Sequence, residues 1–195
     1  KSRNITYDSL LDQVESFAAA LKTKCDVQKG DRVLIYMPMI PEAVVAMLAC
    51  TRLGAVHSVV FGGFAAPELA VRIDDATPKV VVSSSGGLEG LERIVPYGPL
   101  LQSALELAKH KTEHVVFKER AEVLLKGEAP PPVLPSLVVH DWMEFSEHGK
   151  NNTSASDKAC VSCKSSDPLY ILYTSGTTGV PKGILRDHTH PVALS

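Results

Sequence analysis

Residues 32–61, RVLIYMPMIPEAVVAMLACTRLGAVHSVVF, decide the fold. The apolar run Arg32–Met37 is short and continuous, as expected for a strand buried on both faces. Pro41 suits the first position of a helix, and apolar residues then recur until Gly54, which ends the helix. A second apolar run, Ala55–Phe61, predicts another strand. Strand, helix and strand in this order indicate two parallel strands joined by a crossover helix.

The same alternation continues on both sides of this stretch. Upstream, apolar residues at three- and four-residue spacing predict a helix over Tyr7–Lys22, with Thr6 placed to cap it. Downstream, the patterns predict a helix opening at Pro67 and running through Ile73, a strand Lys79–Ser83, a helix Pro99–Lys109, a strand His114–Phe117 and a short strand Leu137–Val139. We therefore predict an α/β fold with a largely parallel sheet flanked by helices. Beyond Lys118, the charged piece, the proline cluster and the polar stretch Ser146–Asp167 are predicted to be loops.

Composition excludes several classes of protein. With 195 residues, 45% hydrophobic and 22% charged, the chain can bury a core and is not predominantly disordered. A net charge of -2 gives no global attraction to nucleic acid or anionic membranes, and the basic residues between Lys109 and Arg120 are predicted to be a solvated helix face. No apolar stretch approaches the roughly 20 residues of a membrane-spanning helix. The chain opens on Lys1 without a signal or transit pattern, so we expect an internal boundary there.

The cysteines and histidines predict no metal site. Four cysteines are too few for a secreted disulfide scaffold, which favours a reducing compartment. Cys160 and Cys163 form a CxxC without a second pair, and His188 and His190 form an HxH without a third ligand. We expect His57 and Trp142 to be ordinary packing residues.

The richest segment for chemistry is 169–183, LYILYTSGTTGVPKG, a buried-strand pattern running into a loop. Gly176, Gly179 and Gly183 allow several backbone N–H groups to converge on phosphate oxygens. Ser175, Thr177 and Thr178 add hydroxyl donors, and Lys182 adds a positive charge. The spacing is neither that of a Walker A loop nor that of a GxGxxG fingerprint. The residues alone leave two readings open, a phosphate-binding loop and a hairpin or surface turn.

Longer motifs carry a resemblance to a known family. Residues 173–183 resemble the signature phosphate loop of the adenylate-forming superfamily, which includes acyl-CoA synthetases, luciferases and the adenylation domains of peptide synthetases. Within it, 54–64 (GAVHSVVFGGF) and 72–75 (RIDD) resemble the short-chain acyl-CoA synthetases. Residues 87–97 and 167–172 resemble the propionate-preferring branch, family member three.

The resemblance implies a two-step reaction. A short carboxylate attacks the α-phosphorus of MgATP to give an acyl-adenylate and pyrophosphate, and the coenzyme A thiol then displaces AMP. Residues implied to cradle the phosphates are Thr174, Ser175, Gly176, Thr177, Thr178 and Gly179, with Lys182 stabilising charge during catalysis. Residues implied to bind coenzyme A are Phe61, Gly62, Gly63, Gly90, Leu91, Glu92 and Arg93. Gly90 departs from the family, because acetyl-CoA synthetases carry an arginine there, and the glycine pair 62–63 equally suits a turn in which glycine serves geometry alone.

The resemblance also implies that residues 1–195 are an incomplete part of the large N-terminal AMP-binding (adenylation) domain. No segment supplies the acyl pocket or the mobile C-terminal domain that bears the adenylation lysine, and the sequence after Asp187 departs from the family pattern. Our hypothesis is a short-chain acyl-CoA synthetase whose substrates are ATP, coenzyme A and an acetate- or propionate-like acid, with Mg²⁺ as cofactor and with this chain inactive by itself. The alternatives are a nucleotide-binding or interaction module and a piece of a longer-chain ligase. The implied location is the mitochondrial matrix, with the cytosol as the alternative.

Overall fold

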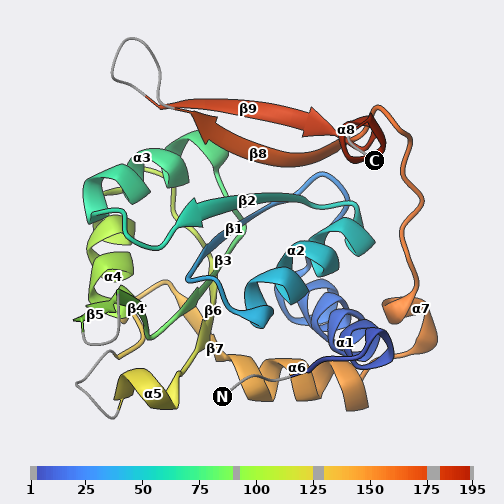
Figure 1. Ribbon diagram of the computed structural model, residues 1–195, viewed down its shortest axis with the longest axis horizontal. Helices are drawn as coiled ribbons and strands as arrows, with labels where there is room; N and C mark the ends of the chain where they lie inside the picture. Colours follow the sequence, from blue (N-terminus) through green and yellow to red (C-terminus); the bar gives the residue numbers. More distant parts are fainter. Residues whose placement is uncertain (1–3, 90–92, 125–129, 175–180, 194–195) are drawn as a thin grey trace.

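A seven-stranded sheet in the order β7-β6-β3-β1-β2-β8-β9 organises the chain (Figure 1). The computed structural model describes residues 4–89, 93–124, 130–174 and 181–193. The strands of the sheet are β1 (Arg32–Met37), β2 (Val56–Phe61), β3 (Val80–Ser84), β6 (His114–Lys118), β7 (Val138–Asp141), β8 (Pro168–Thr174) and β9 (Lys182–Asp187). A separate antiparallel pair joins β4 (Gly86–Glu89) to β5 (Arg93–Pro96).

The predicted helices are present with small differences in their bounds. The helices are α1 (Tyr7–Cys25), α2 (Pro41–Leu53), α3 (Ala66–Ala76), α4 (Tyr97–Leu107), α5 (Ala121–Leu124), α6 (Trp142–Asn151), α7 (Ala155–Lys158) and α8 (Thr189–Ala193). Thr6 caps α1 as predicted, because its hydroxyl accepts from the backbone N–H of Ser9 at 3.2 Å. Gly54 ends α2 with a positive φ of 66°.

The sheet is parallel from β7 to β8, and β9 runs antiparallel to β8. This confirms the predicted α/β class and the largely parallel sheet. The order β2-β1-β3-β6-β7 is that of a doubly wound sheet, in which ligands bind at the carboxyl ends of the strands. The carboxyl ends of β2 and β8 lie at one edge because these two strands are parallel neighbours.

Two apolar cores cover the two faces of the sheet. Alternate residues of β1 divide between them, with Val33 and Ile35 in one core and Leu34 and Tyr36 in the other. The first core also takes buried residues from α1, α2 and α6, and the second takes them from α3 and α4. Figure 1 shows the corresponding helices on opposite sides of the strands.

The prediction that residues 146–167 are loops is wrong in part. Helix α6 continues to Asn151, and α7 follows it. Asp141 starts α6, since its carboxylate accepts from the backbone N–H groups of Met143 and Glu144 at 2.8 and 3.0 Å. Trp142 is buried, and its ring stacks on Phe17 at 4.3 Å, which agrees with its predicted packing role. The helix was missed because its tertiary partner, α1, lies more than a hundred residues earlier in the chain.

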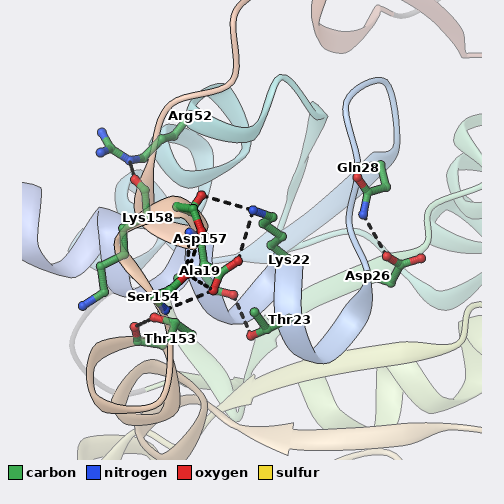
Figure 2. Close-up of polar contacts among 12 residues, drawn as sticks. Ala19, Lys22, Thr23, Asp26, Gln28, Arg52, Thr153, Ser154, Asp157 and Lys158 are labelled. Atoms are coloured by element: carbon green, nitrogen blue, oxygen red, sulfur yellow. Dashed lines mark hydrogen bonds and ion pairs between the residues drawn. The ribbon is translucent and has the colours of Figure 1, made fainter.

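The short helix α7 is attached to α1 by polar contacts (Figure 2). Ser154 forms a capping box with Asp157, which also pairs with Lys22 of α1 at 3.1 Å. The hydrogen bonds from Ser154 and the neighbouring Lys22 ammonium lower the pKa of Asp157 to about 2. Arg52 of α2 donates to the carbonyl of Lys158 at 2.8 Å. Together these polar contacts hold α7 against α1 and α2, although no residue of α7 is buried.

Candidate functional site

The glycine- and hydroxyl-rich segment connects β8 to β9. Thr174, the last residue of β8, pairs across the hairpin with Lys182, the first residue of β9. Ser175, Gly176, Thr177, Thr178 and Gly179, the other residues predicted to cradle phosphate, lie outside the described residues. Both Thr174 and Lys182 are exposed at the carboxyl end of β8, the edge of the sheet where ligands bind in doubly wound folds.

The hairpin is only partly buried. Leu169 is the buried residue of β8, whereas Leu172 and Leu185 are 51% and 57% exposed. The buried-strand pattern predicted for residues 169–173 is therefore wrong beyond Leu169. The cause is position: β8 has β2 on one side and the antiparallel β9 on the other, and within the described residues its packing is mainly against these two strands.

Tyr173 is fixed by a hydrogen bond to α3. Its hydroxyl donates to Asp75 Oδ2 at 2.6 Å. Burial and the Asp75 carboxylate both raise the pKa of Tyr173, so the phenol stays a neutral donor at physiological pH. Gly183 lies opposite Tyr173, where a Cβ would be 3.0 Å from Asp75 Oδ2 and 3.1 Å from the Tyr173 ring. Gly183 thus leaves the space that this hydrogen bond occupies.

Arg72 joins the hairpin to the turn that follows β2. Its side chain is buried at 5% exposure, and its guanidinium lies 4.2 Å from the Phe64 ring centre and 5.3 Å from that of Tyr173. It also donates to the carbonyl of Glu68 at 2.6 Å. Sequence reasoning used Arg72 only as part of a motif, because its contacts join segments about a hundred residues apart. A buried arginine on an amphipathic helix is the signal that points to such a role.

The end of β2 and the turn that follows it contain three of the predicted coenzyme A residues. Phe61 is 70% exposed, and its ring packs edge-on against Phe64. A Cβ at Gly62 would overlap the hydroxyl of Tyr97, and a Cβ at Gly63 would contact the Phe61 ring. Gly62 therefore has a packing reason to be glycine.

The remaining coenzyme A candidates belong to the β4–β5 hairpin. Arg93 is the first residue of β5 and is exposed, whereas Gly90, Leu91 and Glu92 lie outside the described residues. A Cβ at Gly87 of β4 would also overlap the hydroxyl of Tyr97. The structure thus brings the turn at 61–64 and the β4–β5 hairpin together around Tyr97.

His57 lies in β2, opposite Tyr170 of the neighbouring strand β8. Its ring stacks on Tyr170 at 5.7 Å, in agreement with the predicted packing role. Its Nδ1 is buried, and no hydrogen-bond partner for it is found in the described part of the chain. Burial, with a smaller contribution from His188, lowers the pKa of His57 to about 4. The imidazole is therefore neutral at physiological pH and acts as an apolar surface for Tyr170.

Comparison with known proteins shows the family of this chain. Residues 1–194 match the family described as AMP-binding enzyme. The chain belongs to the AMP-binding enzyme family. It is 52% identical over 187 residues to acyl-CoA synthetase short-chain family member B, mitochondrial, of Dictyostelium discoideum, which covers 95% of this chain and 26% of that protein.

Two further relatives have related names. Acyl-CoA synthetase short-chain family member 3, mitochondrial, of Bos taurus is 47% identical, with 93% of this chain and 24% of that protein covered. A propionate–CoA ligase of Salmonella typhimurium is 41% identical, with 96% of this chain and 28% of that protein covered. The chain therefore spans about a quarter of the length of these relatives. Among the described helices, none is long and apolar enough to cross a membrane.

Proposed function

We propose that this chain is the phosphate-binding part of a short-chain acyl-CoA synthetase. The observation that carries the proposal is the hairpin, which sets Thr174 opposite Lys182 at the carboxyl end of β8 in a chain of the AMP-binding family. The names of the Dictyostelium, bovine and Salmonella relatives support the reaction class and a short acid such as propionate or acetate. Residues 1–195 then form part of the N-terminal AMP-binding domain.

The reaction needs positive charge where pyrophosphate leaves. The carboxylate oxygen of the acid bonds to the α-phosphorus of MgATP, and the bond to the bridging oxygen of pyrophosphate breaks, so negative charge grows on the leaving group. In the second step the thiol of coenzyme A loses its proton and displaces AMP from the acyl carbon. Lys182 and the hydroxyl of Thr174 supply donors for the β- and γ-phosphates, together with the segment between them.

The contacts below the loop hold this hairpin in place. Tyr173 is locked between Asp75 and Arg72, so the residue directly before Thr174 has a fixed ring and a fixed backbone position. Arg72 also contacts Phe64, which follows the exposed Phe61 and the glycine pair. We propose coenzyme A binding along this turn and the β4–β5 hairpin, where Arg93 would face a phosphate of the cofactor.

Binding of MgATP to the purified protein tests the phosphate site. Loss of a hydrogen bond to a charged group costs about 1.5–3 kcal/mol, so Lys182→Ala should weaken MgATP and pyrophosphate binding roughly 10- to 100-fold. Lys150→Ala is the matched control, because Lys150 is exposed on α6, away from the hairpin. Calorimetric titration gives both affinities. Equal affinities for the wild type and both variants would refute the site.

For location we propose the mitochondrial matrix, with the cytosol as the alternative. The support is the word mitochondrial in the names of the Dictyostelium and bovine relatives. Fractionation of cells that express the natural protein, followed by protease protection of the mitochondrial fraction, decides between the two.

A further inference from the structure

Three potential metal ligands that lie far apart in the sequence meet at the edge of the sheet. Cys25 is the last residue of α1, His114 the first of β6, and His140 lies in β7. Cys25 Sγ is 3.8 Å from His140 Nε2, and His114 Nδ1 is 3.2 Å from the same Nε2. All three ligand atoms lie within 4.8 Å of one another. This cluster is separate from the proposed phosphate and coenzyme A sites and does not depend on them.

The fold dictates this convergence. In the parallel register of β6 and β7, Val116 pairs with His140, so His140 and His114 point to the same face of the sheet. That face carries α1, since Val116 and Cys25 belong to the same apolar core. Asp26 ends α1 with a φ of 48°, which fixes the last turn and Cys25 with it. The ring of His140 also packs against Phe145 of α6 at 5.1 Å.

Hydrogen bonds alone do not satisfy all three atoms of the cluster. Both the thiol of Cys25 and Nδ1 of His114 approach His140 Nε2, and a neutral imidazole nitrogen either accepts one hydrogen bond or donates one. His140 Nε2 can therefore form a hydrogen bond with Cys25 or with His114. The other of these two contacts then has no hydrogen bond. A cation at the centre of the three atoms removes this conflict, because each atom then directs its own lone pair at the ion.

We propose that Cys25, His114 and His140 bind a zinc ion. Zn–N bonds of about 2.0–2.1 Å and a Zn–S bond of about 2.3 Å in a tetrahedron place two nitrogens about 3.3 Å apart and a sulfur and a nitrogen about 3.6 Å apart. Two of the three observed separations are 3.2 and 3.8 Å, and the third, from Cys25 Sγ to His114 Nδ1, is within 4.8 Å. Three protein ligands of the N/S type with a water molecule in the fourth position are a usual zinc arrangement.

The charges around the cluster are of both signs, with the Glu113 carboxylate and two ammonium groups acting on its members. Cys25 and His140 feel the ammonium of Lys24, and Cys25 and His114 feel that of Lys79. Lys79 is neutralised, since its Nζ lies 3.2 Å from Asp26 Oδ2 and 3.5 Å from Asp31 Oδ2. The buried thiol is protonated without metal, and zinc binding therefore releases one proton to the solvent.

The ion would fasten an edge of the molecule. Strand β7 is the edge strand of the sheet, with β6 as its neighbour there. A bond from His140 through zinc to Cys25 would attach this strand to the end of α1. The expected role is structural, with binding free energy added to the stability of the folded chain.

Cobalt substitution tests the proposal on protein first treated with a chelator. Co²⁺ bound to a thiolate in a tetrahedral site gives intense d–d bands and a sulfur-to-metal charge-transfer band. Cys160, which is exposed, and Cys163, which is half-buried, form a competing thiol pair, so the reference protein is the double variant Cys160→Ser/Cys163→Ser. We expect this reference to bind one Co²⁺ per chain and to lose the bands when one equivalent of Zn²⁺ is added.

Two ligand variants of that reference give the decisive comparison. Cys25→Ala, which keeps a small apolar side chain in the core, should lose the charge-transfer band. His140→Gln should bind Zn²⁺ more weakly by at least the roughly 10- to 100-fold that the loss of an outer-shell partner costs. Zn²⁺ should also raise the Tm of the reference but not that of the Cys25→Ala variant. Bands that survive in Cys25→Ala, or that disappear when only Cys160 and Cys163 are replaced, would overturn the proposal.

Discussion

Strands β1 and β8 are the two parallel neighbours of β2, yet their side chains have different surroundings. From Val33 to Met37, β1 is buried throughout, and its side chains divide between the two cores. In β8 the buried residue is Leu169, and its last residues form contacts with α3 or stay exposed. Burial therefore explains the sequence of β1 but not that of β8 near Thr174, for which we propose phosphate binding as the reason.

The largest expected effect is the loss of stability when an apolar side chain is removed from the centre of the sheet, compared with the same change in the β8–β9 hairpin. Leu34→Ala in β1 removes a side chain that is 0% exposed and should lower the free energy of unfolding by about 2–5 kcal/mol. Leu185→Ala in β9, where the side chain is 57% exposed, should cost less than about 1 kcal/mol. Urea unfolding of both variants measures the two values. Similar losses in both would show that the hairpin is as firmly packed as the sheet centre.

The same contrast explains which elements the sequence could predict. Strands β1, β3 and β6 are continuous apolar runs bounded by turn residues, because parallel strands between two helical layers are buried on both faces. The pairs β4–β5 and β8–β9 lie at the margins, and β4, β5 and β9 were missed because half-exposed short strands carry little periodicity. Helix α6 was missed because its apolar residues are few and depend on Phe17 of α1.

Prediction of the sites divides in the same way. Thr174 and Lys182 could be proposed as phosphate-binding residues because glycine- and hydroxyl-rich loops carry their chemistry in a short contiguous segment. The link from Asp75 and Arg72 to Tyr173 is formed by tertiary contacts between residues about a hundred positions apart, which no local pattern encodes. The cluster of Cys25, His114 and His140 has the same origin, since each residue comes from a different element.

A pH measurement sharpens the comparison at the boundary between β2 and β8. The pKa of His57 is about 4 in the folded protein, below the ordinary 6.5 of an unfolded chain. As the pH falls, His57 is protonated in the unfolded chain before it is protonated in the folded protein. The contribution of neutral His57 to the free energy of unfolding is therefore complete above pH 6.5 and is lost as the pH falls toward 4. The difference corresponds to at most about 3 kcal/mol. His57→Phe keeps a ring against Tyr170 and should remove this component, as shown by urea unfolding at pH 7 and pH 4.5.

The other histidines serve as an internal reference in that experiment. His114 and His140 also have lowered pKa values, but they are present in both proteins and cancel in the difference. If the His57→Phe variant lost as much stability as the wild type between the two pH values, His57 would not be the source of this pH dependence. That result would also mean that the contact between β2 and β8 is more open to water than the structure shows.

The smallest expected effect is the stability cost of replacing Gly62 or Gly63 by alanine, which tests why these residues are glycine. Gly62→Ala should cost about 1–3 kcal/mol, because its methyl group would overlap the hydroxyl of Tyr97, which is buried at 5% exposure. Gly63→Ala should cost less, since the atoms it meets belong to the 70% exposed ring of Phe61, which can move. Tyr97→Phe removes the overlapping oxygen, so the Gly62→Ala change should be milder in that background. Thermal unfolding of the two single variants and of both Tyr97 backgrounds gives the coupling. If Gly62→Ala proved neutral for stability and weakened only coenzyme A binding, the glycine would be present for the ligand, and the turn would belong with Thr174 and not with the core.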